Sequence, residues 1–400
     1  MLETLIIPII KIAIVIGGLM TAAAYLVLLE RWMAAWVQDR KGPNRVGIPL
    51  TKIRMFGLGQ PLADGLKFLF KEEFTPRHVN ALLYTLAPVV TLASALAIYA
   101  VIPLGDTLGS NLTVAGKPLD LIVAPGCDVG LLYIFALSSI AVYGVILGGW
   151  ASNSKYSFLG GLRTSAQMIA YELPLGLGIL GVVLVSGSLD LGQIIRQQAD
   201  SGVWNAFAQP LGMTVFVVAA FAEAARLPFD LPECEQELVG GYHTEYSGMR
   251  LITFLIAEFL HMVTAAMLIT ILFLGGWHFW GLTGTGDATG WVQGLVRVAV
   301  LMAKTFGVIL FFMMVRWSWP RFRFDQLMAL GWKVMLPQGM VNLAVVAVLC
   351  EPFVVASIGS DRVLVFLAIS WGVALVTWIV TALAQPVSAE NRPLPVENSL

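Results

Sequence analysis

Apolar residues in this chain gather into long runs that are separated by polar segments. A helix needs about 20 apolar residues to cross a hydrocarbon layer about 30 Å thick, since each residue rises about 1.5 Å. This criterion predicts nine membrane-crossing helices and no strands. They are expected over residues 5–29, 80–102, 131–150, 166–186, 211–225, 251–277, 291–315, 340–358 and 363–384. The fifth is the shortest, and only residues 359–362 separate the last two.

The composition agrees with this pattern. Apolar residues make up 58% of the chain and charged residues 12%, whereas a soluble protein averages about a quarter charged residues. The 24 Lys and Arg nearly cancel the 25 Asp and Glu, so the chain as a whole has no attraction to nucleic acid. We therefore predict an all-α, polytopic integral membrane bundle that forms a single domain over residues 1–400.

Basic residues are unequally divided between the two sides of the predicted bundle. One side holds 18 Lys and Arg, in residues 30–79, 151–165, 226–250, 316–337 and the tail from 386. The opposite loops hold only Lys117, Arg196 and Arg362. Because loops rich in Lys and Arg stay in the cytoplasm, we expect the N-terminus outside and the C-terminus inside. The start M-L-E-T leads directly into the first apolar run, which predicts a retained anchor rather than a cleaved signal.

The first inner loop contains an amphipathic segment over residues 54–73. Its charged residues recur at helical spacing on one side, at Asp64, Lys67 and Lys71. Its apolar residues collect on the other side, at Leu62, Leu66, Leu69 and Phe70. This pattern predicts a helix that lies in the plane of the membrane interface. The alternative is an ordinary amphipathic helix that packs on a partner protein.

Three predicted helices each carry one carboxylate, at Glu172, Glu223 and Glu258. A charge at the bilayer centre costs about 3 kcal/mol on insertion scales, so such residues face a protein interior or a wet cavity. The three carboxylates lie at similar depth near the inner side, which is what a proton relay needs. The alternative is a set of structural hydrogen bonds or ion pairs, such as Glu223 with Arg226 one turn on.

The third inner loop, residues 226–250, is acidic. Its carboxylates are Asp230, Glu233, Glu235, Glu237 and Glu245, and no Lys or Arg follows Arg226 until Arg250. Proline, glycine and aromatic residues are interleaved with these charges, which predicts an ordered loop docked against something. Facing the basic first loop, it could conduct protons or grip a partner protein.

The sequence offers no redox or hydrolytic machinery. Cys127, Cys234 and Cys350 form no C-x-x-C pair, and the four histidines are equally scattered. No phosphate-binding loop, nucleophile elbow, flavin fingerprint or metal-ligand spacing is present. We therefore expect no metal site, and any electrons must come from partner proteins.

Five stretches in the inner segments resemble the H-subunit family of the proton-translocating NADH-quinone oxidoreductase, respiratory complex I. They are D-R-K-G-P-N-R-V-G (39–47) with Q-P-L-A-D-G-L-K-F-L-F-K-E (60–72), G-W-A-S-N-S-K-Y-S-F-L-G-G-L-R-T-S-A-Q (149–167), the Tyr171-Glu172 pair, L-P-F-D-L-P-E-C-E-Q-E-L (227–238) and P-R-F-R-F-D-Q-L-M (320–328). Together they cover nearly every predicted inner loop.

The resemblance implies a bacterial inner-membrane subunit that forms much of the cavity through which ubiquinone or menaquinone reaches a partner's iron-sulfur cluster. NADH, FMN and the clusters would belong to partner subunits, with antiporter-like subunits on the membrane side. Glu172, Glu223 and Glu258 would form the proton path. The acidic loop, with Asp230, Glu233, Glu235, Glu237, Glu245 and Arg226, would lie beside the quinone chamber. Residues near the quinone entrance would be Glu30, Arg31, Arg40, Asp64 and Lys67.

The chain departs from that family in three places. The linker over residues 47–60 is longer than usual, Cys234 replaces a small residue, and the ninth helix over residues 363–384 lies beyond the part shared with the shortest relatives. Three alternatives remain: the homologous membrane subunit of an energy-converting hydrogenase, a free-standing cation transporter, and a purely structural anchor.

Overall fold

The computed structural model describes residues 2–47, 56–105, 113–114, 117–118, 120–230, 235–284, 290–351 and 362–384. Within these ranges, eight helical stretches are long and apolar enough to cross a membrane. Seven contain the single helices α1 (Leu2–Val37), α3 (Ala81–Ala97), α4 (Gly130–Ala151), α5 (Lys155–Ser186), α10 (Gly248–Leu272), α11 (Trp291–Ser318) and α15 (Arg362–Ala384). The eighth joins α12 (Phe324–Ala329), the π-helical turn η3 (Leu330–Met335) and α13 (Leu336–Cys350). The all-α membrane bundle is confirmed.

The remaining predicted crossing, residues 211–225, corresponds to α8 (Pro210–Glu223). This helix has 14 residues, so it is about 21 Å long and shorter than the hydrocarbon layer. It is nevertheless an interior element, because most of its residues are buried against α5, α10 and α13. A short helix can stay at membrane depth when its neighbours, and not lipid, surround its ends.

Three predicted boundaries need correction. Helix α1 continues to Val37 rather than ending at residue 29. Helix α5 begins at Lys155 rather than at residue 166, because small residues of the preceding polar stretch, including Gly160 and Gly161, are buried in contacts that continue the helix. The eighth crossing begins at residue 324 rather than 340, because α12 and η3 run into α13 without a break. In all three cases a segment expected to be an inner loop is helical.

The shorter elements lie between the long helices. They are α2 (Gln60–Phe70), η1 (Ile98–Ala100), α6 (Leu191–Ser201), α7 (Asn205–Ala208), α9 (Glu235–Leu238), η2 (Gly241–His243) and the small hairpin of β1 (Thr113–Val114) with β2 (Lys117–Pro118). The apolar pattern does not predict α6. The Asp190 side chain accepts a hydrogen bond from the Gly192 amide (3.0 Å) at its start, and Gly202, at φ 69°, ends it. Asp190 is a typical N-cap, and a glycine with positive φ is a typical C-cap.

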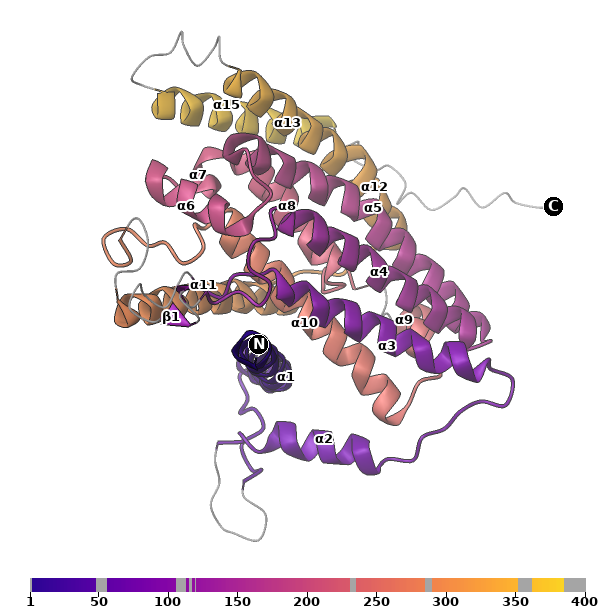
Figure 1. Ribbon diagram of the computed structural model, residues 1–400. Coiled ribbons are helices and arrows are strands. Elements are labelled where there is room, and N and C mark those ends of the chain that lie inside the picture. Colours follow the sequence, from indigo (N-terminus) through magenta and orange to yellow (C-terminus); the bar gives the residue numbers. More distant parts are fainter. Residues whose placement is uncertain are drawn as a thin grey trace, which may run out of the picture.

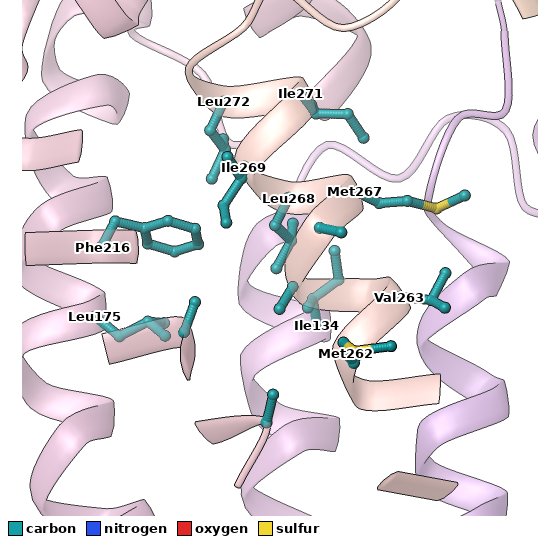
Figure 2. Close-up of a cluster of buried hydrophobic side chains, with 14 of the residues drawn as sticks. Ile134, Leu175, Phe216, Met262, Val263, Met267, Leu268, Ile269, Ile271 and Leu272 are labelled. Atoms are coloured by element: carbon teal, nitrogen blue, oxygen red, sulfur yellow. The ribbon is translucent and has the colours of Figure 1, made fainter. Parts of the chain in front are cut away.

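The hydrophobic core is built around α10. All residues of this helix from 262 to 272 are buried. Figure 2 shows Ile134 of α4, Leu175 of α5 and Phe216 of α8 in the same cluster as the C-terminal half of α10. A helix that is buried on every side must be apolar on every side, which explains why the sequence of α10 has no polar stripe there.

In Figure 1, α3, α4, α5 and α13 run obliquely across the view in successive layers, whereas α1 is seen nearly end-on. Helix α2 lies outside the bundle beside α1 and α10, and α15 lies at the opposite edge against α8 and α13. We call the end of the bundle near α2, where α10 begins and α11 ends, the cavity end. The end where α10 ends and α11 begins is called the far end.

Helix α2 is shorter than the expected 54–73 segment. Phe56 and Gly57 have φ values of 51° and 86°, so the chain turns just before the helix starts, and Lys71 is extended just after it. None of its residues is buried, and its apolar face, with Leu62, Leu66, Leu69 and Phe70, is exposed in this chain.

Candidate functional site

A cavity of about 1020 Å³ opens at the cavity end between α1, the segment after it, α10 and α11. Basic side chains dominate its lining: Arg31, Arg40, Lys41, Arg45, Arg226 and Arg316. Among the described lining residues, Glu30 is the single carboxylate. This excess of positive charge suits a ligand that presents oxygen atoms or develops negative charge.

A line of alternating charges leads from this cavity into the bundle. Arg316 and Arg226 both form ion pairs with Glu30, the second with a 3.5 Å separation between Nη1 and Oε2. Arg226 also pairs with Glu258, with 3.4 Å between Nε and Oε1, and its guanidinium lies 4.3 Å from the centroid of the Phe259 ring. Arg226 is 4% exposed, so these are interior pairs joining α1, α10, α11 and the turn after α8.

Glu258 in turn borders a second, smaller cavity of about 40 Å³, which Glu223 and His261 also line. A volume of this size is large enough for about two water molecules. The predicted carboxylates of α8 and α10 therefore lie at one small cavity. Its other polar lining residues are Thr91, Thr164 and Tyr242.

Two adjacent serines of α4 connect this site to the third carboxylate. Ser138 hydrogen-bonds to Glu223, and the hydroxyl of Ser139 donates to Glu172 of α5. Glu172 and Glu223 are close enough to interact electrostatically. The structure thus brings Glu172, Glu223 and Glu258 onto one polar route that reaches the large cavity through Arg226 and Glu30.

The acidic loop contacts the first loop through its last residues, where the Phe74 amide donates to the Ser247 hydroxyl (3.2 Å). Its described carboxylates have partners elsewhere. Asp230 is buried and pairs with Arg321 at 3.1 Å, and Glu237 pairs with Arg163 of α5. Glu245 accepts a hydrogen bond from the Tyr84 hydroxyl through its backbone carbonyl (2.6 Å). These contacts attach the loop to the second and fourth inner segments and to the start of α3. Glu233, Cys234 and the side chain of Glu235 lie outside the described residues.

The residues expected near the entrance join α1 to α2. Arg31 pairs with Asp64 at 2.7 Å, and Lys67 lies 3.6 Å from the same carboxylate. Arg40 lines the large cavity and bonds Gln38 (2.7 Å). The side-chain pairs thus fix α2 beside the mouth of the cavity. Most of the long 47–60 linker, residues 48–55, is outside the described ranges.

An apolar groove of about 650 Å³ continues from the cavity between α1, α10 and α11. On α1, Val27, Glu30 and Arg31 line the polar cavity, whereas Leu26, Leu29 and Trp32 line the groove. The two sets of residues lie on neighbouring faces of the same two turns of α1. The polar cavity and the apolar groove therefore adjoin along this helix. A ligand with a polar head and a long apolar tail could occupy both.

Three residues of this site are not predicted from the sequence. The apolar pattern places Arg316 in a loop, although it lies in the last turn of α11 and faces Glu30. Ser138 and Ser139 are the other two. Two consecutive hydroxyls in an apolar run are the sequence signal that could have indicated polar partners inside the bundle.

Comparison with known proteins agrees with this geometry. Residues 10–347 match the family model described as NADH dehydrogenase. The chain belongs to this family. Similar proteins are the NADH-quinone oxidoreductase H subunits of Koribacter versatilis (45% identical over 86% of this chain and 96% of the relative) and Geobacter metallireducens (47%, 84% and 94%). The H subunit of Flavobacterium johnsoniae is 42% identical over 87% of this chain and 96% of its own length.

Family membership confirms the resemblance seen in the inner loops and makes the chain a multi-pass membrane subunit of an enzyme complex. The matched region includes every element of the polar route and of the two adjoining spaces. Helix α15 lies beyond it. Its contacts with α7, α8 and α13, including a hydrogen bond from the Trp371 indole to the Phe207 carbonyl (3.0 Å), place it at the edge of the bundle, away from the route.

Proposed function

We propose that this chain, as the H subunit of a proton-translocating NADH-quinone oxidoreductase, forms the membrane side of the quinone site and couples quinone reduction to proton movement. The observation that carries this proposal is the continuous polar route from the basic cavity to Glu172. Electrons come from NADH through FMN and iron-sulfur clusters on partner subunits. The chain sits in a bacterial inner membrane, and its distribution of Lys and Arg favours an orientation with the N-terminus outside and the cavity end toward the cytoplasm.

The substrate is a quinone, ubiquinone or menaquinone, whose head enters the basic cavity and whose isoprenoid tail lies in the apolar groove. The polar cavity suits the polar head of such a molecule, and the adjoining apolar groove suits its apolar tail. Arg31, Arg40, Asp64 and Lys67 shape the mouth, and α2 rests its apolar face in the membrane interface. Lipid then has direct access to the groove beside α1.

Quinone reduction takes up two electrons and two protons to give the quinol. Negative charge that develops on the quinone oxygens is attracted by Arg226 and Arg316. This attraction weakens the ion pairs that these arginines form with Glu30 and Glu258. The change in charge then alters the protonation of Glu258, Glu223 and Glu172 in turn. Such electrostatic coupling needs only the short contacts of the route, because charges at low dielectric interact strongly.

The acidic loop holds its place beside this route by ion pairs. Asp230 and Glu237 are anchored by Arg321 and Arg163. We assign to this loop, including Glu233, Glu235 and Glu245, the electrostatic surroundings of the quinone chamber and a surface for the partner that carries the terminal cluster. The same partner covers the open side of the basic cavity.

Replacing Glu223 by glutamine tests the route. The amide keeps the size and the hydrogen bond with Ser138 but cannot release a proton, so coupled quinone reduction and proton output of the assembled complex are expected to fall at least about ten-fold together. The measurement is NADH-driven acidification in proteoliposomes. Glu351→Gln, at the far end of α13 and exposed, is the matched control and should behave as wild type. Unchanged proton output in Glu223→Gln would remove this residue from the route.

Replacing Gly18 by phenylalanine tests the tail groove. Gly18 lines the groove, and a Cβ atom added there meets no atom within 4 Å, so we expect the ring of phenylalanine to enter the groove without disturbing the fold. The KM for a long-tailed quinone should rise several-fold, whereas the KM for a tail-less analogue should stay constant. Gly17→Phe is the control, since Gly17 is equally open but does not line the groove. An equal effect on both substrates would contradict the assignment.

A further inference from the structure

A half-buried ammonium group occupies the far end of the bundle, remote from the carboxylate route. Lys304 of α11 donates to the three carbonyls that follow α10, those of Leu274 (2.6 Å), Gly276 (3.0 Å) and His278 (2.6 Å). Its Nζ also lies 4.3 Å from the centroid of the Trp204 ring. All three ammonium protons are donated to carbonyls, and an aromatic face adds cation–π attraction. These surroundings stabilise the positively charged form of Lys304.

A second cation lies two turns away on the same helix. Arg297 is 1% exposed and donates to the Thr283 carbonyl from Nε (3.3 Å) and Nη2 (3.2 Å). Burial and the charge of Lys304 lower the pKa of the neighbouring His278, against a smaller opposing effect of Asp200. The hydrogen-bond partners of Lys304 are carbonyl dipoles rather than carboxylates. Dipoles thus stabilise the positive charge of Lys304 but do not cancel it.

The loop that supplies these carbonyls is held rigidly. Gly275 has a φ of 72°, and a side chain there would come within 2.7 Å of the Trp204 ring. Trp204 stacks on Trp280 with 4.2 Å between ring centroids, and the Trp280 indole donates to the Gly202 carbonyl (2.8 Å). The position of the ammonium is consequently fixed by aromatic packing as well as by hydrogen bonds.

A dry layer separates this charge from the carboxylates. Helix α10 places Glu258 and Leu274 about 24 Å apart at 1.5 Å per residue, and its residues 262–273 are all buried. The hydroxyls of Thr264 and Thr270 donate to carbonyls one turn back, those of Leu260 (2.9 Å) and Ala266 (2.8 Å). The layer visible in Figure 2 is therefore filled by apolar side chains and by hydroxyls satisfied within the helix.

We propose that Lys304, supported by Arg297, is an electrostatic seal that keeps protons of the carboxylate route from crossing this chain to the far end. A fixed positive charge at the end of this apolar layer raises the energy of a hydronium ion there, as charged and dipolar barriers do in water-selective channels. The importance of the seal for coupling rests on the proposed function. The seal itself concerns passive permeability and can be tested without turnover.

The test is the passive proton leak of the assembled complex in proteoliposomes under an imposed pH gradient, without NADH or quinone. Lys304→Gln keeps two hydrogen-bond donors for the carbonyls but loses the charge, and should raise the leak about ten-fold. Lys304→Arg keeps the charge and should be as tight as wild type. Lys11→Gln is the matched control, because Lys11 also donates to a carbonyl, that of Ile122 (3.2 Å), at part-buried depth.

A Lys304→Gln complex whose passive proton leak equals that of wild type would contradict the proposed seal. Glu223→Gln should remain tight in the same assay, so failure of the seal and failure of the carboxylate route give different results. Hydrogen exchange on the wild-type complex supplies a measurement that needs no variant. Backbone amides of residues 262–272 should exchange as slowly as the most protected core, and rapid exchange there would show a wet layer and contradict the proposal.

Discussion

Replacing Arg226 by methionine is expected to produce the largest functional loss of any single change in this chain. Arg226 is buried and joins Glu30 to Glu258, so its removal leaves two interior carboxylates without their shared partner. Breaking a buried pair from one side costs about 3–5 kcal/mol. The carboxylates should respond by taking up protons, which removes their response to charge on the quinone.

The expected measurement for Arg226→Met is NADH–quinone turnover with simultaneous proton output in the purified complex, and both should fall by at least about ten-fold. Arg163→Met is the matched control, because Arg163 pairs with Glu237 at a more exposed place, where an ion pair contributes about 1 kcal/mol or less. Turnover of Arg226→Met within two-fold of wild type would show that the charge line from Glu30 to Glu258 does not transmit the signal.

The positions of the buried carboxylates could be predicted from sequence because their cost is local. Glu172 and Glu223 stand out in apolar runs whatever their partners are, since an unsupported charge in that place is unfavourable. Their partners could not be predicted in the same way. Glu30 and Arg226 are 196 positions apart, and no period or spacing indicates which of several basic residues turns toward that carboxylate.

Eight of the nine predicted crossings correspond to helices long enough to span a membrane, and the ninth corresponds to the shorter helix α8. Several of the predicted boundaries are wrong. Length and apolarity define a crossing, but the first turns of α5 and the segment 324–335 are polar enough to resemble loops. They are helical because they pack on other elements at the cavity end, as Tyr171 does when its hydroxyl donates to the Leu327 carbonyl (2.8 Å). Tertiary packing of this kind overrides local propensity.

The docking of the acidic loop depends on individual pairs and not on net charge. The sequence indicates an acidic loop that faces the basic first loop, and the last residues of the loop do contact that segment, as Ser247 does with Phe74. The described carboxylates Asp230 and Glu237 pair with arginines of other segments, and the basic residues near α2 either line the cavity or pair with Asp64. The positive charge of the first loop thereby stays available to a ligand.

The largest structural loss is expected from Gly160→Ala in α5. A methyl group at this position would lie 2.6 Å from the carbonyl carbon of Gly241 and 2.8 Å from the amide nitrogen of Tyr242, and backbone atoms cannot rotate away. The two segments must separate, at a cost of about 3 kcal/mol. Because Tyr242 lines the small cavity shared by Glu223 and Glu258, the displacement should also disturb the carboxylate route.

Gly176→Ala is the matched control on the same helix, because a methyl group there meets no atom within 4 Å. Alanine is favoured over glycine inside a helix by up to about 1 kcal/mol, so this variant should be at least as stable as wild type. The apparent melting temperature of the purified complex should therefore move in opposite directions in the two variants, and only Gly160→Ala should lose proton output. Equal melting temperatures would mean that η2 can move away from α5 without loss of stability. The contact between η2 and α5 would then not determine the shape of the small cavity.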